Sequence, residues 1–264
     1  MSRRCIADLK AFLLDFDGTF VLGNHLLPGA AELFDILRKR EIPFLFLTNN
    51  SSASAFEYQA KLDRLGFKVR KDQILTSGDA TLIYLRDATS YRSVYLLGTP
   101  SLEEDFTSAG FILTDDNPDC VVIGYDKTIT YEKMAKASIL LASGIPYFAT
   151  HPDYTCITAE GLIPDTGAFV VALEKVTGRV PKYIGKPMPE MANAALARLG
   201  ANAHETAMIG DQLDTDIKMA QSSGLFGVLV LSGETSKERY EAQSEIVADM
   251  VLPNVSGLLR ELSS

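Results

Sequence analysis

Residues 11–19 read Ala-Phe-Leu-Leu-Asp-Phe-Asp-Gly-Thr, a short apolar run followed by two carboxylates one residue apart, Asp15 and Asp17. The apolar run predicts a buried β-strand. In open α/β sheets, ligands bind beyond the carboxyl ends of the strands, which is where these acids stand. Because two close carboxylates repel each other, a cation beside them is favoured. An ordinary acidic turn is the other interpretation, since Asp and Gly are common in turns.

Apolar runs alternate with amphipathic stretches along the rest of the chain. This pattern predicts repeated βα units and therefore an α/β fold with a doubly wound parallel sheet. The expected strands are 11–15, 43–47, 93–97, 120–124, 146–149, 206–210, 226–231 and 249–252. The expected helices are 30–40, 54–65, 79–87, 101–109, 131–142, 167–177, 189–199, 214–222 and 256–262.

Residues 94–149 contain two βα steps of their own, which indicates a second, smaller domain inserted into the first. The junctions are expected near Ser77-Gly78 and Val180-Pro181, where turn residues gather. The sequence therefore predicts a core of residues 1–78 and 181–264, with an inserted α/β domain of residues 79–180.

The chain has 264 residues and a formal net charge of −9. This acidic balance argues against a nucleic-acid partner, because phosphate backbones require a basic face. The three cysteines are widely spaced and form no zinc-binding pattern, which is typical of a reducing cytosol. The apolar run before Asp15 is too short for a signal peptide or a membrane span. We expect a soluble, cytoplasmic protein with no membrane partner.

A second polar segment follows the next apolar strand, in residues 44–52 with the sequence FLFLTNNSS. Thr48, Asn49 and the serines after them stand where the strand turns into a helix. Such a turn offers backbone N–H groups and a hydroxyl to an anion. The alternative is an ordinary helix N-cap, for which Ser and Asn are preferred.

Two later segments add a cation and more carboxylates. Lys186 stands between Gly185 and Pro187, on a constrained backbone, and its ammonium group can neutralise phosphate charge. Taken alone, a lysine is more often simply solvated. Residues 207–216, AMIGDQLDTD, again place an acid, Asp211, at the end of a strand. With Asp15 and Asp17 it would make an oxygen site suited to Mg²⁺. Asp216 is compatible with this site or with a helix N-terminus.

Together these four segments resemble the motifs of the haloacid dehalogenase superfamily of phosphohydrolases, and the resemblance covers the whole chain. The insertion is similar to the large α/β cap of the branch that includes nitrophenylphosphatases, N-acetylglucosamine-phosphate phosphatases and phosphoglycolate phosphatases. That similarity is carried by residues 124–126 with Tyr131, by residues 149–153 and by residues 177–179. Relatives often have Asn where His151 stands and Gly where Asp165 stands.

The resemblance implies a Mg²⁺-dependent phosphatase acting on small phosphomonoesters such as sugar phosphates, phosphoglycolate-like molecules or nitrophenyl phosphate. Asp15 would be the nucleophile that forms an aspartyl-phosphate, and Asp17 would be the general acid and base. Its metal site would use Asp15, the Asp17 backbone carbonyl and Asp211. The resemblance further implies that Thr48, the Asn49 backbone and Lys186 bind the phosphate. Asp216 would have a supporting role and orient Lys186 or a metal-bound water. Gly18 would allow a bend in the backbone.

Substrate specificity is expected from the cap, with candidates just after a predicted strand. The candidates are His151, Asp153, Tyr154 and Thr155, and a purely structural turn is equally compatible with them. A phosphomutase or phosphotransferase on the same fold is the main alternative, and a phospho-acceptor signalling domain is a remote one. A dehalogenase is disfavoured, because a halide leaving group needs no proton from Asp17. The sequence leaves a homo-oligomer open.

Overall fold

The structure is a computed structural model that describes residues 5–158 and 160–263. Contacts divide the chain into two compact units. The first unit contains residues 1–48, 59–75 and 191–264, and the second contains residues 49–58 and 76–190. The expected fold class, a doubly wound parallel-sheet core with an inserted α/β domain, is confirmed. The expected boundaries at 78/79 and 180/181 stay a prediction.

The first unit is built on a six-stranded sheet. In sheet order the strands are β15 (Met250–Leu252), β14 (Phe226–Val230), β13 (Thr206–Gly210), β1 (Ala11–Asp15), β4 (Phe44–Thr48) and β5 (Ile74–Thr76). The pairings from β15 to β4 are all parallel, with Leu14 opposite Ile209 and Asp15 opposite Leu47. Strands β1, β4, β13 and β14 are buried along their whole length, which explains their continuous apolar runs.

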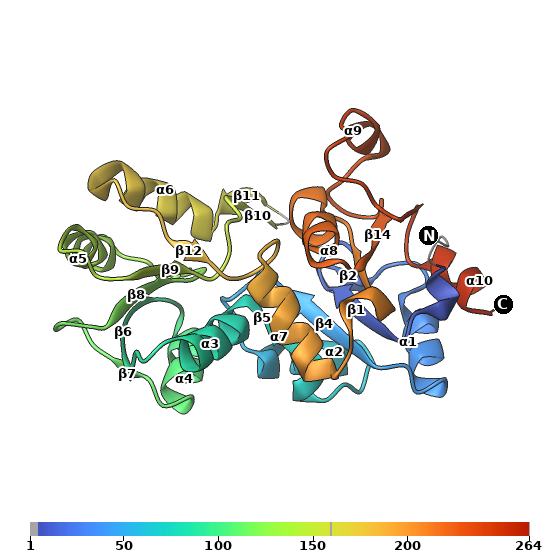
Figure 1. Cartoon of the computed structure of the whole chain (residues 1–264), viewed down its shortest axis with the longest axis horizontal. Coiled ribbons are helices and arrows are strands. Elements are labelled where there is room, and N and C mark those ends of the chain that lie inside the picture. Colours follow the sequence, from blue (N-terminus) through green and yellow to red (C-terminus); the bar gives the residue numbers. More distant parts are fainter. Residues whose placement is uncertain (1–4, 159, 264) are drawn as a thin grey trace. The chain divides into compact units, whose positions relative to one another are not determined.

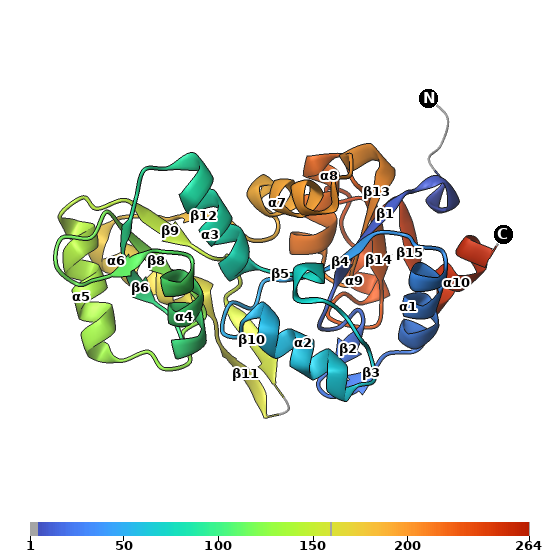
Figure 2. The ribbon, with the colours of Figure 1, turned by 90° about the horizontal axis from the view of Figure 1, so that it is seen from below.

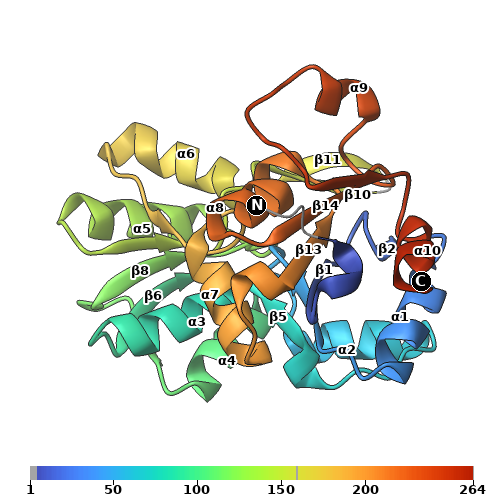
Figure 3. The same cartoon turned by 45° about the vertical axis from the view of Figure 1, so that its right-hand side comes forward.

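Helices cover both faces of this sheet, as Figures 2 and 3 show. They are α1 (Ala30–Lys39), α2 (Ala55–Arg64), α7 (Pro189–Leu199), α8 (Lys218–Ser223) and α10 (Ser256–Ser263), while the short helix α9 (Lys237–Glu241) projects from the connection after β14 (Figure 3). Helices α7 and α8 lie on one side, while α1 and α10 pack together on the other (Figure 2). Helix α1 buries Ala30, Leu33, Phe34 and Leu37, the spacing that places apolar side chains on one helical face.

Five phenylalanines form a cluster where helix α1 packs against the sheet near strand β4. Phe34 lies 4.9 Å from Phe67 and 5.6 Å from Phe44, and Phe20 lies 4.9 Å from Phe46, measured between ring centroids. All these pairs have edge-to-face geometry, which aromatic rings prefer. This cluster fixes the strands whose ends carry the candidate site residues.

Several short elements complete the first unit. A two-stranded hairpin, β2 (Val21–Leu22) and β3 (His25–Leu26), follows β1 directly. The helix expected over 214–222 begins instead as a π-helical turn, Leu213–Ile217, and continues as α8. The remaining elements are the 3₁₀ turns Ile6–Asp8, Lys71–Gln73 and Ala203–Glu205.

The second unit has its own five-stranded parallel sheet. In sheet order the strands are β12 (Lys182–Tyr183), β9 (Tyr147–Ala149), β8 (Cys120–Ile123), β6 (Ser93–Leu97) and β7 (Ile112–Leu113). Its helices are α3 (Ser77–Ala88), α4 (Pro100–Ser108), α5 (Tyr131–Ala142) and α6 (Thr166–Thr177). Helices α5 and α6 lie on one face, and α3 and α4 lie on the other (Figure 1). An exposed antiparallel hairpin, β10 (Thr155–Thr158) and β11 (Gly161–Pro164), precedes α6.

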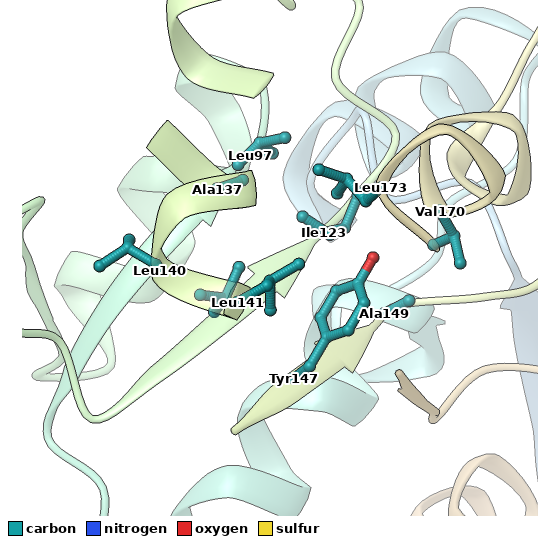
Figure 4. Close-up of a cluster of buried hydrophobic side chains, with 10 residues drawn as sticks. Leu97, Ile123, Ala137, Leu140, Leu141, Tyr147, Ala149, Val170 and Leu173 are labelled. Carbon is teal, nitrogen blue, oxygen red and sulfur yellow. The ribbon is translucent and has the colours of Figure 1, made fainter. Parts of the chain in front are cut away.

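The core of the second unit lies between its sheet and helices α5 and α6. Figure 4 shows Ile123 and Ala149 from the sheet facing Leu141 of α5 and Leu173 of α6, with Tyr147 beside them. All five side chains are buried. Burial of this apolar surface gives the second unit a hydrophobic core of its own.

Candidate active site

Three buried carboxylates gather at the carboxyl ends of neighbouring strands β1 and β13. Asp15 is the last residue of β1, Asp211 follows β13, and Asp216 belongs to the π-helical turn after it. One carboxylate oxygen from each lies within 4.8 Å of the other two. Because three close carboxylates repel one another strongly when ionised, this arrangement suits a divalent cation.

Asp211 is held by hydrogen bonds on both sides. Its Oδ1 accepts from the Thr19 hydroxyl at 3.2 Å, and its Oδ2 accepts from the Glu234 N–H at 2.7 Å. A Cβ added to Gly18 or to Gly233 would collide with this carboxylate. Two glycines therefore leave the room that Asp211 occupies, one after β1 and one after β14.

Asp216 is placed by the turn that begins the next helix. Its Oδ2 accepts from the backbone N–H of Gln212 at 3.1 Å, and a Cβ on Gly210 would overlap the Asp216 carboxylate. The Asp216 carboxylate therefore occupies space that is open only because Gly210, at the end of β13, has no side chain. The sequence assigned Asp216 a supporting role, and the geometry places its oxygen within the carboxylate group.

The side chain of Asp17 is half-exposed and lies next to a cation. Its Oδ1 is 3.3 Å from the Nζ of Lys61, and that Nζ lies 4.8 Å from the centre of the Phe16 ring. Phe16 packs edge-on against Phe46 at 5.9 Å, which fixes the backbone between the two acids. Gly18 follows with φ 88°, a left-handed conformation that allows the chain to bend into the β2–β3 hairpin.

The residues predicted to bind phosphate come from both units. Thr48 ends β4 in the first unit and is buried. Asn49 and Lys186 belong to the second unit, where both are buried and hydrogen-bonded to each other. The Asn49 carbonyl accepts a hydrogen bond from the Ser77 hydroxyl. Asn49 therefore holds Lys186 with its side chain and is itself fixed through its backbone.

His151 is completely buried, and both of its ring nitrogens have partners. Nε2 lies 2.9 Å from Asp165 Oδ1, and Nδ1 lies 2.9 Å from the Thr150 hydroxyl. Asp165 also caps α6 by accepting from the backbone N–H of Thr166. These contacts tie the end of β9 to the start of α6. Tyr154 and Thr155, by contrast, are exposed.

The charges around His151 set its titration. Burial by itself lowers the pKa of His151, but the hydrogen bond and the charge of Asp165, helped by the charge of Asp153, raise the pKa above its ordinary value. Lys186 acts weakly in the opposite direction. Burial also raises the pKa of Asp153. Hence His151 favours the imidazolium form that pairs with Asp165.

Comparisons with known proteins agree with this geometry. A family model described as haloacid dehalogenase-like hydrolase matches residues 12–112, and a second, described as HAD-hydrolase-like, matches residues 183–258. An acid sugar phosphatase from Staphylococcus haemolyticus is 35% identical over 237 residues, which cover 89% of this chain and 90% of that protein. The chain belongs to the haloacid dehalogenase superfamily.

Other members of this superfamily are similar along nearly the whole chain. A dihydroxyacetone phosphatase from Corynebacterium glutamicum is 36% identical, covering 84% of this chain and 81% of that protein. The crystal structure of a 4-nitrophenylphosphatase from Thermotoga maritima has a TM-score of 0.94 and 40% identity, covering 97% of this chain and 98% of that chain. The predicted resemblance to the capped phosphatases of the superfamily is confirmed.

Two parts of the site are absent from the sequence-based prediction. One is Lys61, whose partner Asp17 lies 44 residues earlier. The other is the segment Ser232–Glu234, where Ser232 donates to the Gly18 carbonyl at 2.9 Å and Glu234 bonds Asp211. A signal for that segment existed, because it follows β14, the neighbour of β13 in a parallel sheet. Lys61 gave none, since a single lysine on a helix is ordinary.

Proposed function

We propose that this protein hydrolyses small phosphomonoesters in the presence of Mg²⁺ and forms an aspartyl-phosphate on Asp15. The observation that carries the proposal is the group of buried carboxylates formed by Asp15, Asp211 and Asp216. A hard, all-oxygen donor set of this kind fits Mg²⁺ better than a softer metal. Two relatives are named as an acid sugar phosphatase and a dihydroxyacetone phosphatase, and a similar solved structure is named as a 4-nitrophenylphosphatase.

The metal would be held by the carboxylates of Asp15 and Asp211 and by the backbone carbonyl of Asp17, with Asp216 beside them. When bound, Mg²⁺ neutralises negative charge and lets a carboxylate approach an anionic phosphate. The collisions that a Cβ on Gly18 or Gly233 would cause with Asp211 indicate a carboxylate kept in one place. A fixed carboxylate lowers the cost of organising the site when substrate arrives.

Two carboxylates of the first motif would divide the chemistry. Asp15, at the end of β1, attacks phosphorus, and the bond to the leaving oxygen breaks as the aspartyl-phosphate forms. Asp17 gives its proton to the leaving oxygen and then takes a proton from the water that hydrolyses the intermediate. The half-exposed position of Asp17 supports this role, because its carboxyl group has to exchange protons with substrate and water.

Thr48, the backbone N–H of Asn49 and the ammonium of Lys186 would bind the phosphate oxygens and stabilise their charge in the transition state. Asn49 directly follows Thr48 in the chain, and its side chain bonds the backbone of Lys186. The three groups are therefore linked through consecutive or hydrogen-bonded residues.

We propose further that the second unit acts as the cap that selects the alcohol part of the substrate. Tyr154 precedes the β10–β11 hairpin and Thr155 begins it, and both are exposed, so of the four cap candidates these two are the most accessible to a ligand. His151 is fully buried and both of its ring nitrogens have partners, which supports a structural role for it. The preferred substrates would be sugar phosphates and similar small phosphomonoesters.

The protein is proposed to work in the cytoplasm on small molecules. None of the cysteines Cys5, Cys120 and Cys156 forms a disulfide, as a reducing compartment would require. Among the described residues, the helices are all too short or too polar to cross a bilayer.

The direct test is hydrolysis of p-nitrophenyl phosphate by the purified protein, followed by a panel of sugar and triose phosphates. We expect turnover with Mg²⁺, loss of turnover with EDTA and recovery when Mg²⁺ is restored. Full activity in metal-free buffer would overturn the metal assignment. Absence of turnover on every phosphomonoester with Mg²⁺ present would overturn the function.

A further inference from the structure

The side-chain amide of Asn49 binds both backbone polar groups of Lys186. Its Oδ1 accepts from the Lys186 N–H at 2.8 Å, and its Nδ2 donates to the Lys186 carbonyl at 3.0 Å. Asn49 is 7% exposed and Lys186 is 3% exposed. One buried amide therefore holds the backbone of the lysine at two points, where water does not compete.

Asp153 adds a further hydrogen bond to this amide. The same Nδ2 of Asn49 donates to Asp153 Oδ2 at 3.0 Å. An ionised carboxylate only accepts hydrogen bonds, so it selects the amide orientation with nitrogen toward Asp153. The reversed amide would place two acceptors against each other at Asp153 and two donors against each other at the Lys186 N–H. Asp153 thereby reinforces the orientation that the Lys186 N–H and carbonyl select.

The backbone around this contact has little room to shift. A Cβ on Gly185 would stand 2.7 Å from Asn49 Oδ1 and 2.5 Å from the Thr150 carbonyl. The Gly185 N–H donates to that carbonyl at 2.7 Å. Only glycine permits the approach of residues 185 and 186 to Asn49. Such close packing transmits a displacement of Asn49 to Lys186.

We propose that Asn49 and Asp153 are positioning residues that set where the Lys186 ammonium stands when phosphate binds. The inference rests on the proposed function, in which Lys186 binds the phosphate group. A lysine carries its charge on a flexible four-carbon stem, so holding its backbone limits the positions that the ammonium can reach. Small displacements of a binding group reduce catalysis strongly. Asp153 is thus assigned to phosphate binding through Asn49, and not to recognition of the alcohol.

This assignment differs from a specificity role in a measurable way. If Asp153 contacts the alcohol part of the substrate, its removal changes the ranking of substrates. If Asp153 acts through Asn49 and Lys186, all phosphomonoesters lose by the same factor, because they share the phosphate group. An asparagine at position 153 keeps an oxygen acceptor for Asn49 Nδ2 and should preserve the arrangement.

The experiment compares Asp153→Ala and Asp153→Asn with the wild-type protein. Kinetics would be measured on p-nitrophenyl phosphate and two sugar phosphates, and binding of inorganic phosphate would be measured by calorimetry with Mg²⁺. For Asp153→Ala we expect kcat/KM to fall about 10- to 100-fold, equally for all three substrates, with weaker phosphate binding. For Asp153→Asn, kcat/KM should stay within about threefold of the wild-type value, a change that corresponds to about half the free energy of one typical hydrogen bond.

A matched control is Asp126→Ala. Asp126 is another carboxylate of the second unit and is fully buried, but it pairs with Lys133 at 2.8 Å and with Thr128. We expect this variant to lower the melting temperature without weakening phosphate binding to the folded protein. It separates general destabilisation of the second unit from loss of Lys186 positioning.

The outcomes are distinct. A loss in Asp153→Ala that depends on the substrate alcohol, or an equal loss in Asp153→Asn, would overturn the positioning role. Unchanged phosphate binding in folded Asp153→Ala would do the same. The binding measurement needs no turnover, so a wild-type protein that binds phosphate but hydrolyses no ester would refute the proposed function while still testing the positioning of Lys186.

Discussion

The Nζ of Lys61 lies 3.3 Å from Oδ1 of Asp17, the proposed general acid, and also rests over the face of Phe16. Lys61 comes from helix α2 and is only about a quarter exposed, whereas the Asp17 side chain is about half exposed. The ring of Phe16 thus holds the Lys61 ammonium beside Asp17, which is the acid of the first motif that does not belong to the buried carboxylate group. Lys61 therefore influences where the Asp17 carboxylate rests.

Replacing Lys61 tests this relationship. In Lys61→Met we expect kcat for an alkyl phosphate to fall about two- to fivefold, the range for a partly exposed ion pair. Hydrolysis of p-nitrophenyl phosphate should change less, because its leaving group needs little protonation. Lys61→Arg keeps the charge and should retain most activity. Equal rate losses for both esters in Lys61→Met would argue against an effect through Asp17.

Removing the acid itself should have a larger effect with the same signature. For Asp17→Asn we expect a loss of about 10²-fold or more in kcat on alkyl phosphates, the usual contribution of general acid–base catalysis. For nitrophenyl phosphate, the loss of rate in the first chemical step, formation of the aspartyl-phosphate, should be smaller. A plot of log kcat/KM against leaving-group pKa should therefore be steeper for the variant. Identical slopes for variant and wild type would contradict the acid role.

Gly18 and Gly23 form a matched pair for testing the carboxylate site. Both have left-handed backbones, with φ values of 88° and 60°, but only a Cβ at Gly18 would meet the Asp211 carboxylate. We expect Gly18→Ala to weaken Mg²⁺ binding, measured by calorimetry, by more than tenfold. Gly23→Ala should cost about 1 kcal/mol of folding stability through backbone strain and leave metal affinity unchanged. Equal metal affinities in the two variants would show that Asp211 does not depend on the space at Gly18.

The buried pair of His151 and Asp165 should make stability depend on pH. The pKa of His151 is raised in the folded protein, so its contribution is fully present below the unfolded pKa of about 6.5 and is lost as pH rises through the folded pKa. Unfolding by urea should show His151→Asn to be less stable than wild type by roughly 3–5 kcal/mol near pH 6, the cost of breaking a buried ion pair. The difference should shrink toward pH 9.

The other charges facing His151 are Asp153 and Lys186, and both remain in this comparison. Asp165→Asn removes the acidic partner of the His151–Asp165 pair. We expect this variant to lose the same pH-dependent part of the free energy of unfolding. A difference between wild type and His151→Asn that stays constant from pH 6 to pH 9 would contradict the charged pair.

The main elements and the first motif were predictable because their signals are local. The expected strand 11–15 and helix 131–142 match β1 and α5 in both bounds, since a buried strand and a capped amphipathic helix are written in consecutive residues. The strands β2, β3, β5, β7 and β10 to β12, each of two to four residues, were missed. Such short strands have too few residues to show a period, and their pairing depends on tertiary contacts.

The site shows the same division. The carboxylates at strand ends follow from sheet geometry, which any βα pattern implies. The inclusion of Asp216 in the group depends on a π-helical turn, and sequence periodicity predicted an ordinary helix there. The bond from Asn49 to Lys186 joins residues 137 positions apart. No spacing rule predicts such a contact, because it is set by the packing of Gly185 against Thr150.

The central claim, covalent catalysis by Asp15, is tested most directly by trapping the intermediate. In Asp17→Asn, p-nitrophenyl phosphate should still phosphorylate the enzyme, because its leaving group needs no acid, while hydrolysis of the intermediate slows for lack of a base. We predict a burst of nitrophenolate of about one equivalent per active site, consistent with covalent catalysis, and, after acid quenching, mass spectrometry of peptides should locate the phosphoryl group on Asp15. Turnover by wild type with no burst in the variant, or a phosphoryl group on another residue, would contradict the account.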